Sequence, residues 1–328
     1  MVVGQQNKMK KLIFINFIFI LLIILLLEII MNVFKFSGLM GIQKGMIYKG
    51  ENTHYLKPHN EGIVFNEIVF TDSNGYRVPS KNYKYTGDSD IFILGDSVAF
   101  GNGVKEQETF IGLLRKELSK NNFLNSSAPG YQINDHINVV NQTSKFRNVD
   151  KIIYFFTLND IYSSSNIENL NNKKKESDYS LKKYKLLKEL NVFLRNKSYL
   201  YMFIKGIGTD PSKRWFLNLY ENFEKKDLDE TKKNFISLKN FSRNLQSDFL
   251  VILLPYEFQT RSCSKNILKP QSRISDILLN LSIEFKDLTY IFCKQKDPKK
   301  NFYKFDPMHL SKQGHKLVYN ALRDEINF

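Results

Sequence analysis

Residues 91–101 read IFILGDSVAFG, and the character of the chain changes at this stretch. The first four residues are apolar, which is typical of a short strand. Gly95 and Gly101 flank the next residues and permit a tight backbone turn. We therefore expect Ser97 to lie just after a strand, at the edge of a parallel sheet where ligands bind. Taken alone, the same residues also fit a plain turn in which Asp96 or Ser97 caps a helix.

Strand-like and helix-like segments alternate from residue 91 to the C-terminus. Further strands are expected at residues 122–126, 151–157, 249–255 and 290–293, and helices at 108–118, 132–145, 272–285 and 311–322. This alternation predicts an α/β fold with a parallel sheet between helical layers. Lys-rich helical segments interrupt it at residues 161–244, and we expect this insertion to form a lid or a flank.

A second polar motif lies near the C-terminus, where Asp306 stands three residues before His309. A serine hydroxyl is a poor nucleophile at neutral pH. It needs an imidazole to accept its proton and a carboxylate to orient that imidazole. Asp306 and His309 are candidates for these roles, with Ser97 as the nucleophile. The alternative is that Asp306 caps the last helix and His309 is a surface residue.

Two further residues at strand ends suit an oxyanion site. Asn159 follows the strand expected at 151–157, so its side-chain amide is placed to donate to a negatively charged oxygen. Gly130 follows the strand expected at 122–126 and exposes a backbone N–H with no side chain beside it. Asn-Asp and Pro-Gly are also ordinary turn dipeptides, so each signal is weak by itself. The four signals together, in order and all at strand ends, predict one site.

These blocks resemble those of the SGNH/GDSL hydrolase superfamily, namely Gly95-Asp96-Ser97, Gly130, Asn159-Asp160 and Asp306-x-x-His309. The resemblance covers about residues 91–322. It implies a three-layer α/β/α sandwich in which Ser97 is the nucleophile, His309 the general base and Asp306 its orienting carboxylate. It also implies an oxyanion hole made by the N–H groups of Ser97 and Gly130 and by the side chain of Asn159.

Two details of the sequence add to this resemblance. The third block usually begins with glycine in the superfamily, whereas this chain has Thr157, and we expect the extra side chain to narrow the pocket beside the oxyanion donor. Residues 72–77, DSNGYR, are similar to the stretch that precedes the first block in envelope-attached members.

Residues 12–33 form an apolar run that only Asn16, Glu28 and Asn32 interrupt. As a helix this run is roughly 33 Å long, enough to cross a hydrocarbon core of about 30 Å once. A cleaved signal peptide and a buried core helix are the alternatives. The run exceeds the usual apolar region of a signal peptide, and no Ala-x-Ala-like site follows it, which favours an uncleaved anchor. Lysines lie on both sides, so charge alone does not fix the orientation, but a short cationic tail favours the cytoplasm.

The expected organisation therefore has four parts. They are a cytoplasmic tail at residues 1–11, a transmembrane anchor at 12–34, a tether and N-terminal extension at 35–90, and a catalytic domain at 91–328. We expect the catalytic domain to lie outside the cytoplasm.

The composition of the 328 residues excludes several classes of protein. Hydrophobic residues make up 42%, as in a globular chain that buries a full core. No Cys-x-x-Cys or His-Glu-x-x-His spacing suggests zinc, so we expect no metal and no cofactor. Cys263 and Cys293 either pair or remain free thiols. The net charge is +15, but no nucleic-acid module is present, so we expect the positive field to face anionic headgroups or acidic glycans.

The expected function is ester hydrolysis through an acyl-serine intermediate, which removes acyl groups, acetyl above all, from a carbohydrate or another envelope ester. One alternative is an O-acyltransferase that moves the acyl group to a glycan hydroxyl with the same triad. The other is a catalytically silent, membrane-anchored binding protein, which is disfavoured because all the catalytic side chains are present. The expected partners are a small ester or acylated carbohydrate and the membrane, with no nucleic acid.

Overall fold

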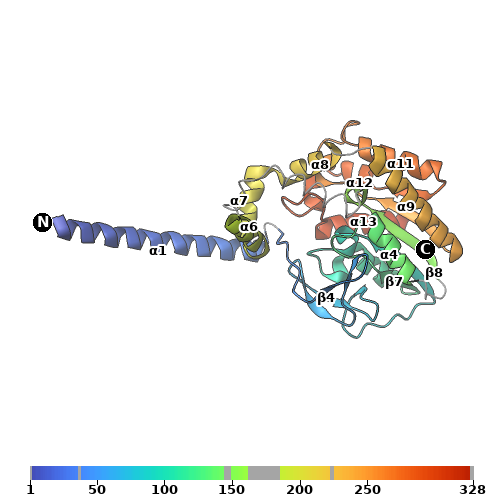
Figure 1. Ribbon diagram of the computed structural model, residues 1–328, viewed down its shortest axis with the longest axis horizontal. Helices are drawn as coiled ribbons and strands as arrows, with labels where there is room; N and C mark the ends of the chain where they lie inside the picture. Colours follow the sequence, from blue (N-terminus) through green and yellow to red (C-terminus); the bar gives the residue numbers. More distant parts are fainter. Residues whose placement is uncertain (1, 36–37, 144–148, 162–184, 222–224, 326–328) are drawn as a thin grey trace.

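The computed structural model describes residues 2–35, 38–143, 149–161, 185–221 and 225–325. One long helix leads into a globular body (Figure 1). Residues 162–184 of the expected insertion lie outside the described residues, and so do the last two residues of the helix expected at 132–145.

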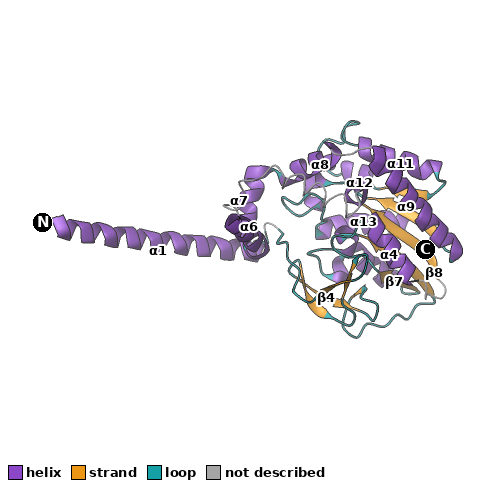
Figure 2. Ribbon diagram, in the orientation of Figure 1, coloured by secondary structure: helices purple, strands orange, loops and turns teal. Residues whose placement is uncertain are grey.

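A five-stranded parallel sheet forms the centre of the body (Figure 2). Its strands, in spatial order, are β10 (Glu284–Asp287), β9 (Asp248–Leu253), β8 (Val149–Phe156), β6 (Ser89–Gly95) and β7 (Asn121–Asn125). All four pairings are parallel. β6 lies between β7 and β8, with Gly95 opposite Phe155 and Ile93 opposite Asn125. The carboxyl ends of these three strands are therefore neighbours, and the first three sequence blocks follow them directly.

Helices cover both faces of this sheet. They are α3 (Phe110–Glu117), α4 (Ile133–Thr143), α9 (Lys225–Asn244), α11 (Lys269–Asn280) and α13 (Lys312–Glu325). Phe155 of β8 contacts Phe110 of α3, whereas its neighbours Tyr154 and Phe156 contact Phe235 of α9. Successive residues of a strand point to opposite faces, so α3 and α9 lie on opposite sides of the sheet. Since α13 packs against α3, and α4 and α11 pack against α9, the expected three-layer α/β/α sandwich is confirmed.

Two elements near the C-terminus differ from the expectation. The helix expected at 272–285 ends at Asn280, and β10 follows it after Ser282, whose φ of +50° interrupts a right-handed helix. The strand expected at 290–293 is instead α12 (Thr289–Cys293). A four-residue apolar run does not distinguish a strand from a buried helix. Here the Asp287 carboxylate accepts the N–H of Thr289 at 2.9 Å and starts the helix.

The segment between the long helix and β6 contains two small antiparallel sheets that the sequence does not predict. One pairs β1 (Ile47–Lys49) with β2 (His54–Leu56), and the other joins β3 (Glu61–Val64), β4 (Glu67–Thr71) and β5 (Arg77–Val78). Met46, Leu56, Val64 and Val69 share one hydrophobic core with the central sheet. These short strands therefore pack onto the body and bring their turns to its surface.

The long helix α1 (Val2–Phe34) stands clear of the body (Figure 1). Its residues 8–34 are long and apolar enough to cross a membrane, and its most apolar part is not buried by the rest of the protein. At its C-terminal end lie α6 (Lys185–Lys197) and α7 (Tyr199–Thr209), and α8 (Pro211–Glu221) connects them to the body.

A disulfide joins Cys263 to Cys293, with 6.0 Å between the Cα atoms. It connects the segment after α10 (Glu257–Thr260) to the end of α12. Of the two alternatives that the sequence leaves open, the structure has the paired one.

Candidate active site

Ser97 is the first residue of α2 (Ser97–Phe100), a single helical turn that starts directly after β6. Asp96 caps this turn, because its Oδ1 accepts the N–H of Val98 at 2.8 Å. Gly95 allows the sharp turn, since a Cβ at this position would lie only 2.5 Å from the Cβ of Ala99. Helix capping and a site serine are thus compatible in this motif: Asp96 is the cap, and Ser97 is turned toward the C-terminal block.

The C-terminal block brings His309 against Ser97. The Nε2 atom of His309 lies 2.8 Å from the Oγ atom of Ser97, and its Nδ1 atom lies 2.8 Å from Oδ2 of Asp306. The other carboxylate oxygen of Asp306 accepts the backbone N–H groups of Met308 and His309, at 2.9 and 2.7 Å. Asp306 therefore holds the imidazole both through the ring and through the backbone of the loop before α13.

The electrostatics of this pair favour charge separation. Burial would lower the pKa of His309, but the charge and hydrogen bond of Asp306, together with the charge of Asp96, raise it above 6.5. Burial would likewise raise the pKa of Asp306, whereas His309 and the backbone N–H groups lower it below its usual value. Asp306 therefore stays ionised, accepts the proton on Nδ1, and leaves Nε2 free to accept a proton from Ser97.

Asn159 lies in η2 (Leu158–Ile161), the turn that follows β8. Its Nδ2 donates to Oδ2 of Asp96 at 3.0 Å, and its Oδ1 accepts the hydroxyl of Tyr256 at 3.2 Å. One amide hydrogen is therefore committed to Asp96, and the second is available to another acceptor. These contacts fix the orientation of the amide next to the serine turn.

Gly130 follows β7 in a left-handed conformation, with φ of +86°, and it is exposed. The carbonyl of the preceding Pro129 accepts a hydrogen bond from Nε2 of His54 at 2.9 Å. The loop that carries Gly130 is therefore held from the N-terminal sheets. A Cβ placed at Gly130 would lie 3.7 Å from Cε1 of His54, an ordinary contact distance.

Thr157 is buried, and its hydroxyl does not line the pocket beside His309. The hydroxyl lies 3.0 Å from Oδ2 of Asp96 and also contacts Oδ1 of Asn159. Burial raises the pKa of Asp96 in spite of the donors from Val98, Asn159 and Thr157. The threonine side chain thus supports the carboxylate behind Ser97, which gives it a positioning role that the sequence does not reveal.

Arg77 supports the nucleophile turn from the other side. Its guanidinium is buried and donates to the carbonyl oxygens of Phe100, Gly101 and Val104. A fork of five donors suits such a set of diverging carbonyls. Gly101 itself is left-handed, with φ of +83°, and a Cβ there would lie 2.4 Å from Thr109. The stretch at residues 72–77 therefore has a structural task at the site, which is to fix the loop after Ser97.

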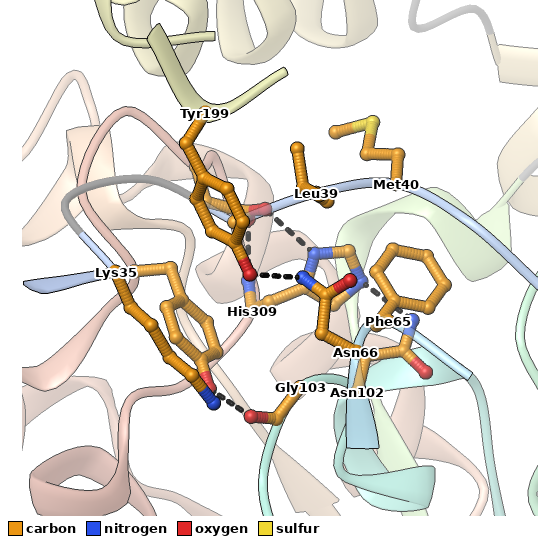
Figure 3. Close-up of a pocket in the computed structure, with 12 residues that line it drawn as sticks. Lys35, Leu39, Met40, Phe65, Asn66, Asn102, Gly103, Tyr199 and His309 are labelled. Carbon is orange, nitrogen blue, oxygen red and sulfur yellow. Dashed lines mark hydrogen bonds and ion pairs between the residues drawn. The ribbon is translucent and has the colours of Figure 1, made fainter. Parts of the chain in front are cut away.

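A small pocket opens beside His309 (Figure 3). Phe65 forms one wall, with 5.6 Å between its ring centroid and that of His309. Asn102 forms another, and its Nδ2 lies 3.3 Å from Nε2 of His309. The remaining lining includes Tyr199 and Tyr303. The sequence does not predict any of these residues, although Asn102 stands between two glycines directly after the serine motif.

Phe65 reaches the pocket because it lies at the tip of the hairpin formed by β3 and β4. Phe65 and Asn66 both have positive φ, +50° and +67°. A two-residue hairpin turn of this kind requires positive φ at both positions, which asparagine tolerates and phenylalanine seldom adopts. The bond from Asn66 Nδ2 to the Tyr199 hydroxyl, at 2.8 Å, fixes the turn over the site.

Among the described residues, no cluster of three or more histidine, cysteine, aspartate or glutamate side chains could hold a metal ion.

Known proteins similar to this chain are found among solved structures. No protein-family model matches the sequence, and no curated protein sequence matches it significantly. A lipolytic G-D-S-L family protein from Veillonella parvula is similar over 73% of this chain and 98% of its own, with 11% identity and a TM-score of 0.45. An acetylxylan esterase from Geobacillus stearothermophilus is similar over 75% of this chain and 97% of its own, with 15% identity and a TM-score of 0.42. A lipase/acylhydrolase from Enterococcus faecalis is similar over 73% and 97%, with 12% identity and a TM-score of 0.42.

The chain's own architecture carries the classification. Three polar blocks follow the neighbouring strands β6, β7 and β8, and the fourth precedes α13 and meets the first. Helices cover both faces of the parallel sheet. The chain therefore has the expected three-layer α/β/α fold, with the four sequence blocks in the predicted order around the carboxyl ends of its central strands.

Proposed function

We propose that this chain is a serine esterase in which Ser97, His309 and Asp306 form a catalytic triad. One observation carries the proposal, the unbroken chain of hydrogen bonds from Ser97 Oγ through the imidazole to the Asp306 carboxylate, with 2.8 Å at both contacts. The tautomer that Asp306 imposes leaves Nε2 as the acceptor for the serine proton.

The reaction follows from these positions. Ser97 Oγ attacks the ester carbonyl carbon while Nε2 of His309 takes the hydroxyl proton. The N–H groups of Ser97 and Gly130 and the amide of Asn159 donate to the negatively charged oxygen of the tetrahedral intermediate. The N–H of Ser97 suits this role because the first residue of a helix has no acceptor within that helix.

The intermediate collapses when the imidazolium returns the proton to the leaving alcohol, and the acyl group stays on Ser97. Water then loses a proton to Nε2, attacks the acyl carbonyl and releases the carboxylic acid. Each step moves one proton through the same imidazole, and the enzyme returns to its starting state.

The proposed substrate carries a small acyl group, acetyl above all. The pocket beside His309 holds about 30 Å³ of free space. That is room for roughly two water molecules. Phe65 and Tyr199 line this pocket and are held by packing or by a hydrogen bond, so it offers little room for a long acyl chain beside the imidazole.

We further propose that α1 is an uncleaved membrane anchor and that the body lies outside the cytoplasm. Glu28 of α1 accepts hydrogen bonds from residues 198–200 at the start of α7, and Lys35 pairs with Glu67 at 3.1 Å. The end of α1 is thus bonded to the folded body, unlike a segment that is removed. The disulfide between Cys263 and Cys293 supports an oxidising compartment for the body.

The triad is tested with a fluorophosphonate probe, which reacts with activated serines. The full chain in detergent should be labelled at Ser97, and Ser97→Ala should lose both the label and the hydrolysis of an aryl acetate. Ser127→Ala is a matched control, because Ser127 is a buried neighbour of the site outside the triad. A folded protein that fails to label would show that the triad is silent.

The identity of the acceptor is tested in the same assay. Release of acetate at an equal rate with and without an acylatable glycan is the expected result for an esterase. Transfer of the acetyl group to the glycan at the expense of acetate would identify the protein as an O-acyltransferase instead.

A further inference from the structure

The helices α6 and α7 expose large apolar side chains at the end of α1. We define the α6–α7 patch as Leu186, Leu187, Leu190 and Phe193 of α6 with Ile204 and Ile207 of α7. All six side chains are exposed, and Phe193 and Ile207 are 59% and 64% accessible. Leu186, Leu190 and Phe193 recur at helical spacing and form one stripe. Soluble proteins seldom leave such a concentration of apolar groups in water.

The opposite side of α7 is packed, which shows that its exposed side is a face of a fixed helix. A Cβ on Gly206 would lie 2.2 Å from the ring of Phe305, so this ring packs directly against the backbone of α7. Phe203 contacts the same ring, with 5.6 Å between centroids. α7 is therefore seated on the body through these residues. Ile204 stands away from them, whereas Ile207 lies at the edge, where it is exposed and also lines the cavity between α7 and the body.

The start of α7 is bonded to α1. The carboxylate of Glu28 accepts the hydroxyl of Ser198 at 2.6 Å and the N–H groups of Tyr199 and Leu200 at 2.6 and 3.2 Å. It therefore satisfies N–H groups that a helix start leaves without partners. A carboxylate in an apolar anchor belongs at the membrane boundary. The hairpin of α6 and α7 is consequently held at the level where α1 leaves the bilayer (Figure 1).

We propose that the α6–α7 patch is a second membrane contact, inserted among the lipids of the leaflet from which α1 emerges. The inference rests on the proposed role of α1 as an anchor. The patch continues the apolar surface of α1, because α1 contacts α7 and α7 contacts α6. A helix with one apolar stripe and a polar remainder is the kind that lies in the plane of a membrane interface.

The charges of α6 favour anionic lipids as the partner. The helix contains more basic than acidic residues. Lys188 and Lys197 are exposed, Arg195 contacts the sulfur of Met40, and Glu189 is the one acidic residue. Basic side chains around an apolar stripe bind lipid phosphates while the stripe enters the acyl region.

This contact places the candidate active site at the membrane surface. Lys35, Leu39 and Met40, which follow α1 directly, line the pocket beside His309, and so does Tyr199, the first residue of α7. The pocket is thus built partly from the segments that meet the bilayer (Figure 3). The substrate that fits this position is a small-acyl ester on a molecule that is itself held in the membrane.

The patch is tested by site-directed fluorescence in the full chain. Phe193→Cys and Ile207→Cys are labelled with the environment-sensitive dye NBD, since the native cysteines are joined and do not react. The proteins are reconstituted into vesicles of equal parts phosphatidylcholine and phosphatidylglycerol, with or without a lipid that carries a nitroxide near the top of its acyl chain. The control is Leu279→Cys, an equally exposed site on α11.

We expect blue-shifted emission and several-fold stronger quenching by the nitroxide lipid at positions 193 and 207 than at 279. Equal, water-like emission at all three positions would overturn the proposal. Blue-shifted emission at 193 and 207 without quenching would also overturn it, because the patch would then be covered by protein, such as a second copy of the chain.

Enzyme activity provides a second test of the proposal, independent of the quenching experiment. The double variant Leu190→Glu with Phe193→Glu should hydrolyse a vesicle-embedded acetate ester, made from a phenol with a long alkyl tail, several-fold more slowly than wild type. Its rate on a water-soluble aryl acetate should stay unchanged. Equal rates for variant and wild type on both esters would contradict the membrane placement of the site. If wild type hydrolyses neither ester, the proposed esterase function is refuted, whereas the quenching result still tests the membrane contact.

Discussion

Asp306 contacts His309 at two points, the ring nitrogen Nδ1 and the backbone N–H. Asp306→Asn keeps an oxygen and a similar shape, but its amide stabilises the imidazole tautomer that carries the proton on Nε2. His309 then has no lone pair for the serine proton, so we expect kcat for an aryl acetate to fall about 10⁴-fold. Circular dichroism should show an unchanged fold. A fall of only a few-fold would mean that Asp306 does not orient the base.

The pH dependence of the reaction follows from the raised pKa of His309. Only the neutral imidazole accepts the serine proton, and the pKa of His309 in the free enzyme lies above 6.5. We therefore expect kcat/KM to be full at alkaline pH and to fall as the pH drops through a value above 6.5. An NMR titration of the imidazole in Ser97→Ala should give the same value. Adding Asp306→Asn should lower it, because the Asp306 charge and hydrogen bond raise the pKa.

Asn159 is expected to contribute to the transition state more than to the fold. Loss of one oxyanion donor costs about 2.7–4 kcal/mol, so Asn159→Ala should slow kcat about 10²–10³-fold. Asp96 keeps its donors from Val98 and Thr157 in this variant, but the buried hydroxyl of Tyr256 loses its acceptor. The free energy of unfolding should therefore fall by about 1–3 kcal/mol while the protein stays folded. Unchanged turnover would exclude Asn159 from the site, and an unfolded variant would assign it a structural role.

At the scale of elements, the turn after Ser97 depends on Arg77. Arg77→Met leaves the carbonyls of Phe100, Gly101 and Val104 without their donor. Each unsatisfied buried carbonyl costs roughly 1–3 kcal/mol, so we expect the free energy of unfolding to fall by about 3 kcal/mol or more and kcat to fall with it. Urea denaturation of Arg243→Met, an exposed arginine in the last turn of α9, provides the control. Equal stability of the two variants would contradict this role.

The elements that the sequence predicts are those whose pattern is long or chemically distinctive. Apolar strands such as β8, and the helix α13, lie within a few residues of their expected positions. The prediction is wrong at β10 and α12, because four or five residues are too few to show the hydrophobic periodicity of a strand or a helix. The strands of the N-terminal sheets are just as short, and tertiary packing decides their conformation.

The residues of the candidate site also divide into those that the sequence predicts and those that it does not. Ser97, His309 and Asp306 are predictable because nucleophile chemistry demands their residue types. Phe65 and Asn102 are not, because a phenylalanine and an asparagine acquire a role only from where the fold puts them. Phe65 depends on a hairpin turn with positive φ, and no local sequence signal marks a phenylalanine for that conformation.

At the scale of the whole molecule, the end of α1 and the imidazole of His309 are connected through few residues. Glu28 caps α7 at Tyr199, the Tyr199 hydroxyl accepts the amide of Asn66, and the adjacent Phe65 packs on His309. Glu28, the charged residue within the apolar run, thus links α1 to the residues around the candidate active site.

This connection predicts that Glu28→Ala disturbs the site from inside α1. The variant removes the acceptor for Ser198, Tyr199 and Leu200, and loss of a helix cap costs about 0.5–2 kcal/mol. Hydrogen exchange of the full chain in vesicles should accelerate at residues 199–202, because their N–H groups open more often without the cap. KM for an aryl acetate should rise more than kcat falls, since Tyr199 lines the pocket beside His309. Glu28→Gln keeps an acceptor oxygen and should restore much of the protection, while Asn32→Ala, one turn further along α1, should behave as wild type. Protection in Glu28→Ala equal to that in Asn32→Ala would mean that the anchor and the pocket are independent.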